Sequence, residues 1–204
     1  MTLAPPPAPR TPLHLRRISC EGFLRDDGLY DLEGLLVDTK PVTLPLVTRE
    51  VPAGEAIHQM RVRLTIDREM TIVDARVYSE HTPYPDCMEV EANYRQLVGM
   101  RIGPGFTSEV KRLFRGTAGC SHMTELLPPL ASTAFQVMWA NNDFDSVDAE
   151  GSTQRTSPLG GCHALRVDGR IVRTYFPQVL KGLPAADADP ATAPKLGPGR
   201  GKAA

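Results

Sequence analysis

The sequence lacks the short motifs that would assign a function directly. It contains no phosphate-cradling GxxxxGK[ST] loop, no GxGxxG after an expected strand and no GxSxG turn. The commonest nucleotide-binding and serine hydrolase designs are therefore absent, and we expect no nucleotide cofactor. No stretch approaches the ~20 apolar residues of a membrane helix, and the start, MTLAPPPAPR, has no apolar signal-peptide core. We therefore expect no membrane partner and a cytoplasmic location.

Neither sign of charge dominates the chain. The 23 Lys and Arg residues against 24 Asp and Glu residues leave a net charge of -1, which offers no general attraction to a polyanion. Nucleic acid is therefore not an expected partner. Cysteine is also scarce, with four residues in 204, and in a cytoplasmic protein these should be reduced thiols rather than disulfides.

Large apolar residues are rare at both ends of the chain. Five of the 19 prolines fall within residues 1–12, and residues 181–204 are mostly Ala, Pro, Asp and Gly. Such segments bury too little apolar surface to offset their chain entropy, so we predict two disordered tails. Residues 141–161 are polar and turn-rich, which indicates a flexible segment. A single domain over residues 13–180 is the resulting prediction.

Alternating apolar and polar residues predict two β-hairpins in the first half of this domain. The first joins Leu13–Arg25 to Leu29–Thr39 through Asp26-Asp27-Gly28. The second joins Ala56–Ile66 to Met70–Tyr78. A further hairpin is predicted near the end of the domain, where Cys162–Val167 and Arg170–Phe176 flank Asp168-Gly169.

Helical spacing of apolar residues replaces this alternation between the second and third hairpins. One short helix is predicted after Asp86, ending at Gly99, and another from Thr107 or Ser108 to Gly116. A third begins near Ser121 and runs toward Trp139, and we expect Pro128-Pro129 to break or kink it. The fold class predicted is α+β, an antiparallel β-sheet with about three helices packed on one face.

Four side chains are candidate metal ligands: His58, Cys87, Cys120 and His122. Cys87 and Cys120 are expected at helix starts, where unpaired N–H groups and the helix dipole favour a thiolate. Zinc or iron is the metal that we expect from such ligands. The paired Cys-x-x-Cys spacing of many structural zinc sites is absent, so the same residues could also be buried and inert.

Two other features leave alternatives open. Cys162 adjoins His163, and this pair could ligate a metal or simply begin a strand. Arg16 and Arg17 could bind a carboxylate substrate or lie at the surface without a role.

Seven motifs follow one another over roughly residues 13–177: RRISCEGFLRDDGLYDLEGLLVDTK, GEAIHQMRVRLTID, PYPDC, LVGMRIGPG, GTAGCSHMTELL, ASTAFQ and CHALRVDG. Their order resembles a bacterial family of unknown function, DUF2889. This resemblance implies one common fold. The family's occurrence beside genes for the degradation of aromatic compounds implies an aromatic acid as a first guess at the substrate.

The order of elements is also similar to that of the NifU and IscU iron-sulfur scaffold proteins. That resemblance would match Cys87 and Cys120 to two of the scaffold's cysteines, and it would put His58 where the scaffold has its first cysteine. His122 follows its cysteine, whereas the scaffold histidine precedes it. The absence of the scaffold's first cysteine argues against cluster assembly and leaves binding of a single metal ion open.

Three hypotheses about function follow from the sequence. The first is a small-molecule metabolic enzyme with a Cys/His metal centre, a lyase or hydrolase that acts on an aromatic acid or a related carbonyl compound. The second is a metal or iron-sulfur carrier without enzymatic activity. The third is a structural or interaction module with inert cysteines. A homo-oligomer is compatible with all three.

Overall fold

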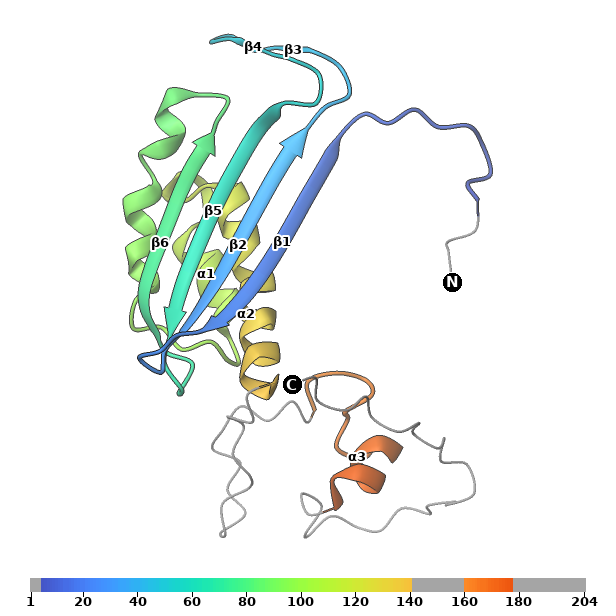
Figure 1. Ribbon diagram of the computed structural model, residues 1–204, viewed down its shortest axis with the longest axis vertical. Coiled ribbons are helices and arrows are strands. Elements are labelled where there is room, and N and C mark those ends of the chain that lie inside the picture. The colour runs from blue at the N-terminus through green and yellow to red at the C-terminus, as the bar shows by residue number, and fades with distance from the viewer. Residues whose placement is uncertain (1–4, 141–159, 178–204) are drawn as a thin grey trace. The chain divides into compact units, whose positions relative to one another are not determined.

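The computed structural model describes residues 5–140 and 160–177, and the chain divides into two compact units, Met1–Asp145 and Ser146–Ala204. The first unit contains a four-stranded antiparallel sheet in the order β1-β2-β5-β6 (Figure 1). Its strands are β1 (Leu15–Leu24), β2 (Tyr30–Thr39), β5 (Ala56–Ile66) and β6 (Ile72–His81). A small ribbon of β3 (Leu44–Pro45) and β4 (Glu50–Val51) lies in the connection between β2 and β5.

The two predicted hairpins of the first half are confirmed. β1 pairs with β2 and β5 pairs with β6, and the central pair of the sheet is β2 with β5. At the first turn the amide of Arg25 donates to the carbonyl of Leu29 at 2.9 Å, and Gly28 adopts a positive φ of 84° that suits glycine. β5 has the predicted bounds, while β6 extends three residues beyond Tyr78.

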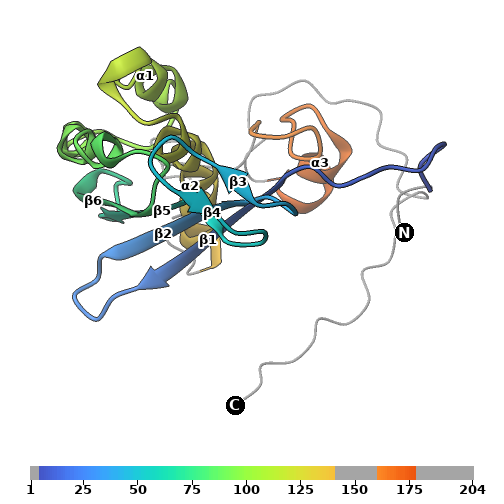
Figure 2. The same cartoon turned by 90° about the horizontal axis from the view of Figure 1, so that it is seen from above.

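Helices cover one face of this sheet, as Figure 2 shows from above. They are α1 (Phe106–Leu113), α2 (Ser121–Ala140) and the 3-10 helices η1 (Pro85–Met88), η2 (Glu91–Leu97) and η3 (Gly116–Ala118). The α+β fold class is therefore confirmed, with the helices packed on one face of an antiparallel sheet.

Two local predictions about these helices are wrong. The single helix after Asp86 is instead two 3-10 segments, because Val90 between them has a ψ of −7° and the segment forms tighter turns than an α-helix. Of the predicted break or kink at Pro128-Pro129, the break is wrong, since α2 continues through both prolines, and the kink stays a prediction. The hydroxyls of Ser132 and Thr133 donate to the carbonyls of Pro128 and Pro129, one turn earlier, at 3.3 and 3.0 Å.

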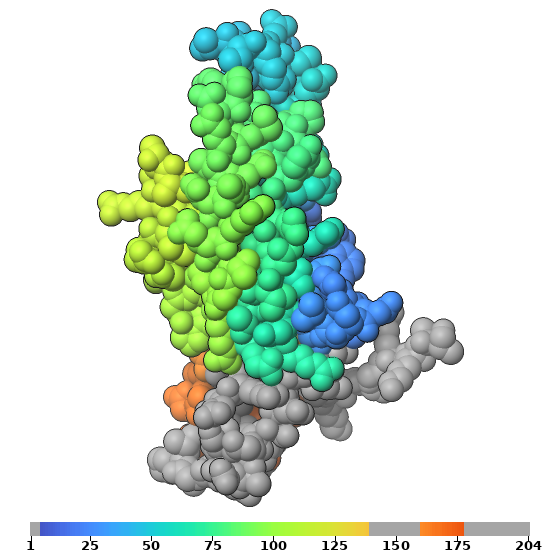
Figure 3. Space-filling view, turned by 90° about the vertical axis from the view of Figure 1, so that its left-hand side faces the viewer, coloured from blue at the N-terminus to red at the C-terminus, as the bar shows by residue number. Residues whose placement is uncertain are grey.

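The outer edge of β6 is covered by the chain that follows it. Ile72 donates to the carbonyl of Met100 and accepts from the amide of Gly99, both at 2.8 Å. Farther along the strand, the carboxylate of Glu91 accepts a hydrogen bond from the amide of Ser79 at 2.8 Å. Figure 3 shows the continuous surface that β6 and the following segment form on this side. This edge of the sheet is therefore covered at both ends of β6.

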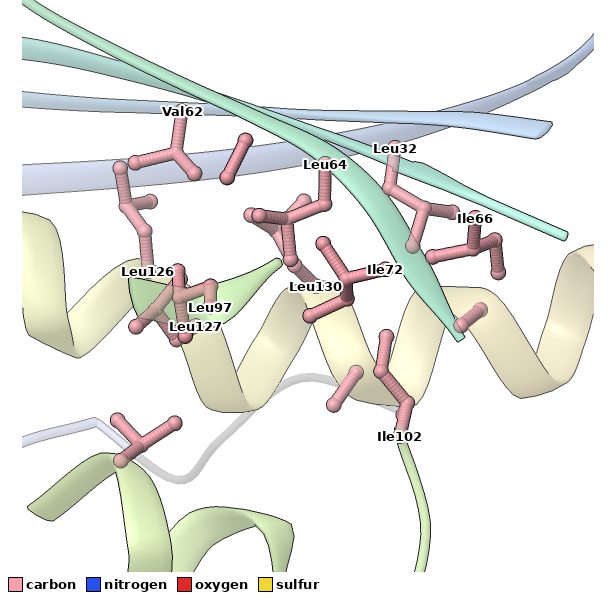
Figure 4. Packing of buried hydrophobic residues seen from close by; sticks show 14 of the residues in the cluster. Leu32, Val62, Leu64, Ile66, Ile72, Leu97, Ile102, Leu126, Leu127 and Leu130 are labelled. Carbon is pink, nitrogen blue, oxygen red and sulfur yellow. The ribbon is translucent and has the colours of Figure 1, made fainter. Parts of the chain in front are cut away.

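The core lies between the sheet and α2. Alternate residues of β2 and β5, among them Leu32, Leu64 and Ile66, point toward Leu127 and Leu130 of α2 and are completely buried (Figure 4). The buried residues of α2 recur at helical spacing, which matches its amphipathic pattern: Met123, Leu126, Leu127, Leu130, Ala131, Ala134 and Met138. Burial of this cluster is the main contribution to stability in the first unit.

The second unit contains a short helix, α3 (Arg170–Tyr175), where the sequence predicted a hairpin. The prediction at Asp168-Gly169 is wrong because Gly169 has a φ of −80° and begins the helix, with its carbonyl accepting from the amide of Arg173. A tight hairpin turn would instead need positive φ angles. Most of the predicted tails and of the flexible segment lies outside the described residues, and the single domain over residues 13–180 stays a prediction. No described helix has the length and apolarity needed to span a membrane.

Close approach of α2 to the sheet depends on glycine at two strand positions. A methyl group on Gly22 would lie 2.0 Å from Cγ2 of Val137, and one on Gly34 would lie 3.2 Å from Cδ1 of Leu130. We therefore expect Gly22→Ala to lower the free energy of unfolding by about 1–3 kcal/mol, because the stiff valine must move. Gly103→Ala, which meets no atom within 4 Å, is the matched control. Urea denaturation of both variants checks this, and equal stability would contradict it.

Candidate metal centre

A row of polar side chains crosses three strands at one end of the sheet. The register pairs Arg16 of β1 with Asp38 of β2, and Asp38 with His58 of β5. Because side chains alternate along a strand, Asp38 shares the helix-facing side with Leu32 and Leu36. The row lies where β2 ends and β5 begins, at the upper end of the sheet in Figure 1. An irregularity in the pairing of β2 with β5 falls directly after Asp38.

The first turn of α2 adds His122 to this row. Its imidazole stacks on that of His58, with ring centroids 3.7 Å apart. The buried hydroxyl of Tyr94 holds the start of the helix in place. It accepts from the amide of Cys120 at 2.9 Å and lies 2.7 Å from Oγ1 of Thr124. Tyr94 is itself stacked on Phe114, so a packed aromatic pair supports the segment that carries His122.

Three donor atoms from these residues converge. Oδ2 of Asp38 lies 3.2 Å from Nδ1 of His58 and 3.4 Å from Nε2 of His122. One ligand atom from each of the three residues lies within 4.8 Å of the other two, and no other group of this kind occurs in residues 5–140 and 160–177. The Asp38 side chain is 1% exposed and each imidazole is 19% exposed, so the group is partly open to solvent.

Arg16 neutralises the buried carboxylate. Its Nε and Nη2 donate to the two oxygens of Asp38 at 2.8 and 2.7 Å, and its Nη1 donates to the exposed Glu125. His14 also lies 3.1 Å from Oδ1 of Asp38. Burial by itself would raise the pKa of Asp38, but the hydrogen bonds and charge of Arg16, with smaller contributions from His14 and His122, hold it below its usual value. Asp38 is therefore ionised at neutral pH.

Both stacked imidazoles are neutral at pH 7. Burial, assisted by His122 and opposed by Asp38, lowers the pKa of His58 to about 4. Burial and then the charge of Arg16 lower the pKa of His122. The Nδ1 atom of His58 is buried and makes no hydrogen bond with any described residue, although it lies 3.2 Å from Oδ2 of Asp38. A buried nitrogen without a hydrogen-bond partner, aimed at a carboxylate and beside a second imidazole, is suited to bind a cation.

The four ligands predicted from the sequence are partly brought together. His58 and His122 lie in the group, and Sγ of Cys120 is 3.8 Å from Nδ1 of His122, on the far side of the ring from Asp38. Cys87 lies in η1 and is not a member of the group. Cys162 is exposed in the second unit, and His163 accompanies it there.

Sequence reasoning missed Asp38, although a signal was present. Asp38 lies on the same face of β2 as Tyr30, Leu32 and Leu36, because side chains alternate along a strand. The sequence pattern therefore puts a carboxylate on the apolar face of this strand. A charged residue on a core-facing position needs partners and marks a candidate site. Two imidazoles and one carboxylate are ligands that zinc and non-haem iron both accept.

The fold and the polar group together define a small α+β protein with a His/Asp cluster at the end of an antiparallel sheet. A model of the protein family of unknown function DUF2889 matches residues 14–136. The chain therefore belongs to the DUF2889 family, as the resemblance of its motifs indicated, and the match includes all three members of the cluster. No curated protein and no solved structure matches the chain.

The lowered pKa of His58 predicts a specific pH dependence of stability. The unfolded chain takes up a proton on this residue near pH 6.5, whereas the folded protein does so only near pH 4. The free energy of unfolding of the metal-free protein should therefore fall as the pH drops from about 6.5 to about 4. In His58→Gln we expect this loss to be smaller by on the order of 1–2 kcal/mol, allowing for the partial exposure of the ring.

Urea denaturation at several pH values in the presence of a chelator measures this dependence. His81→Gln, at the exposed end of β6, is the control and should keep the wild-type dependence. A loss between pH 6.5 and 4 that is the same in His58→Gln and in the wild type would contradict the buried, neutral imidazole.

Proposed function

We propose that this protein is a metal-dependent enzyme of small-molecule metabolism, with zinc or iron bound by Asp38, His58 and His122. The observation that carries the proposal is the convergence of three donors, one of them the unpartnered buried Nδ1 of His58. A metal bound there would act as a Lewis acid on a carbonyl or carboxylate group. Lyase or hydrolase chemistry is the reaction class, and an aromatic acid is the first substrate to test.

The spacing of the donors is compatible with a bound metal ion. In a tetrahedral site with bonds of 2.0–2.1 Å, neighbouring ligand atoms lie about 3.3 Å apart. The two separations from Oδ2 of Asp38 are 3.2 and 3.4 Å. Arg16 uses one lone pair on each carboxylate oxygen, which leaves another on Oδ2 for the metal.

The protonation states also favour metal binding. Histidine binds metals through a neutral imidazole and aspartate through a carboxylate, so protons normally compete with the metal. Burial keeps both imidazoles neutral, and Arg16 keeps Asp38 ionised, at neutral pH. The contact of Cys120 with Nδ1 of His122 leaves Nε2 on the side of Asp38. A group that fixes the second ring nitrogen is a common support for a metal-bound histidine.

Three protein ligands leave coordination positions open, which is typical of catalytic rather than structural sites. Neither the hollow lined by Glu33, Arg63 and Arg76 nor the hollow lined by Val110, Phe114 and Pro128 includes the three donors. A substrate would instead approach from the solvent side of the two imidazoles. There Arg16 offers a partner for a carboxylate, because the half-exposed Glu125 on its Nη1 can be displaced by an acidic substrate.

A carrier of iron-sulfur clusters is less well supported by this donor set. Sulfide clusters are held mainly by cysteine thiolates, whereas the convergent donors here are two nitrogens and one oxygen. An absorption spectrum of protein purified without oxygen distinguishes the two, because a sulfide cluster absorbs visible light and zinc does not.

Metal binding is the direct test of the site. We expect the chelator-treated protein to bind one Zn²⁺ or Fe²⁺ per chain in calorimetric titration. Metal affinity should fall by more than about 100-fold in each of Asp38→Asn, His58→Gln and His122→Gln. Loss of a residue that only supports a ligand typically costs roughly 10–100-fold in affinity, and loss of a ligand itself should cost more. Cys87→Ser and His81→Gln should bind like the wild type, because neither residue belongs to the cluster. Absence of binding at micromolar metal, or an equal loss in the Cys87→Ser variant, would contradict the assignment.

The enzymatic part of the proposal needs its own measurement. The metal-loaded protein should convert at least one member of a panel of aromatic and aliphatic carboxylic acids, with products identified by mass spectrometry. Activity should disappear in Asp38→Asn and should require the metal. A metal-loaded protein that turns over no acid, and no corresponding ester or aldehyde, would leave a metal-binding protein without the proposed activity.

A further inference from the structure

The two edges of the sheet differ in what covers them. The outer edge of β6 pairs with residues 99–101 and with Glu91, as described above. β1 is the other terminal strand, and no strand within residues 5–140 and 160–177 pairs with its outer edge (Figure 1). β1 is ten residues long and contains no proline. A long uncovered edge strand presents unpaired N–H and C=O groups and readily adds another strand.

Apolar side chains are exposed along this strand. The exposed fraction is 40–54% for Leu15, Ile18, Phe23 and Leu24. Apolar residues of an inner strand would normally be covered. An edge that is protected against association usually carries lysine or proline or is very short. β1 has neither lysine nor proline and is ten residues long, so its only protection of this kind is the charge of Arg16, Arg17 and Glu21.

The charges on the open face of the sheet give a second observation. On the inner strands and β6 they form ion pairs: Arg61 with Glu80, Arg63 with Glu33 and Arg76 with Asp74. On β1, Arg17 and Glu21 form no ion pair with any described residue. They lie on the same face, four residues apart and with opposite signs. Such a pattern is complementary to itself when the strand runs antiparallel to a copy of itself.

We propose that β1 pairs antiparallel with β1 of a second copy of this chain, with Ser19 at the two-fold axis. The amide of Arg25 donates to Leu29 across the first hairpin, so odd-numbered residues of β1 direct their backbone groups toward β2. Even-numbered residues direct theirs toward the free edge. In the pair, even residues therefore face even residues, which permits registers centred on Ile18, Ser19 or Cys20 but none between them.

The charges select the register centred on Ser19. In it Arg17 lies opposite the partner's Glu21, and Leu15 lies opposite the partner's Phe23, each pair occurring twice. On the helix-facing side Ile18 lies opposite the partner's Cys20. A register centred on Ile18 or Cys20 would instead put Arg17 opposite serine or phenylalanine and leave the charges unmatched.

The pairing also has a consequence for the metal centre. With the axis perpendicular to the sheet, the helices of both copies lie on the same side of an eight-stranded sheet. His14 would then lie opposite Leu24 of the partner subunit. The second copy would thus supply one wall beside His14 and Arg16, at the open side of the cluster. The self-association itself does not depend on whether a metal binds.

Charge reversal tests both the association and its register. In sedimentation velocity experiments at tens of micromolar, we expect the full-length protein to be a dimer. Arg17→Glu and Glu21→Arg should each raise the dimer dissociation constant about tenfold or more, because two like-charge pairs replace two ion pairs. An equimolar mixture of the two single variants should form a heterodimer, because every facing pair is again of opposite sign. Circular dichroism melts verify that these exposed substitutions leave the fold intact. A monomeric wild type, or a dimer insensitive to both reversals, overturns the proposal.

Cross-linking provides a second measurement. Ser19→Cys places two thiols opposite each other at the axis, so mild oxidation should yield a disulfide-linked dimer, with the cross-linked peptides identified by mass spectrometry. Leu15→Cys is the matched control, because it keeps the pairing of Arg17 with Glu21 and its two copies would be eight residues out of register, about 26 Å apart along the strand. Equal cross-linking of the two variants, or efficient linkage through native Cys20, would contradict the register centred on Ser19.

Discussion

Burial of the Asp38 carboxylate is the constraint on which this end of the molecule depends. An ionised carboxylate that is 1% exposed costs several kcal/mol unless it is paired and hydrogen-bonded. The compensation comes from separate segments: mainly from Arg16 of β1, with smaller contributions from His14 before it and from His122 of α2. Each segment must be docked before the charge is compensated. The cluster therefore links formation of the sheet to docking of the long helix.

Packing of α2 determines where His122 can lie. The helix approaches β1 and β2 closely because Gly22 and Gly34 leave room for Val137 and Leu130. Its buried residues are spaced for a helix, and this fixes the rotation of α2 about its axis. The stacked pair of Tyr94 and Phe114 then fixes the position of the first turn of the helix. The stacking of His122 on His58 is thus a result of apolar packing by residues of α2 that lie outside the polar cluster.

The sequence predicts local elements well where one periodicity dominates. The alternation in Ala56–Ile66 gave the bounds of β5, and helical spacing after Ser121 gave α2. Competing signals led to the errors: Asp168-Gly169 suits a hairpin turn but also starts a helix, and residues 86–98 fit helical spacing while folding as 3-10 turns. At the site, His58 and His122 were predicted, but Asp38 was not. Its proximity to His58 depends on cross-strand register, which a single strand pattern does not specify.

Strand β1 has two roles that its alternation keeps apart. Arg16 points to the helix side and compensates Asp38, whereas the neighbouring Arg17 points to the open face and lies beside no described anion. Because successive side chains lie on opposite faces, selection can change the charge at one position without direct effect on the other. The backbone nevertheless joins them, since a strand added at the outer edge would hold β1 against β2 and so hold Arg16 against Asp38. An edge that associates therefore stabilises the position of the arginine that keeps the buried carboxylate ionised.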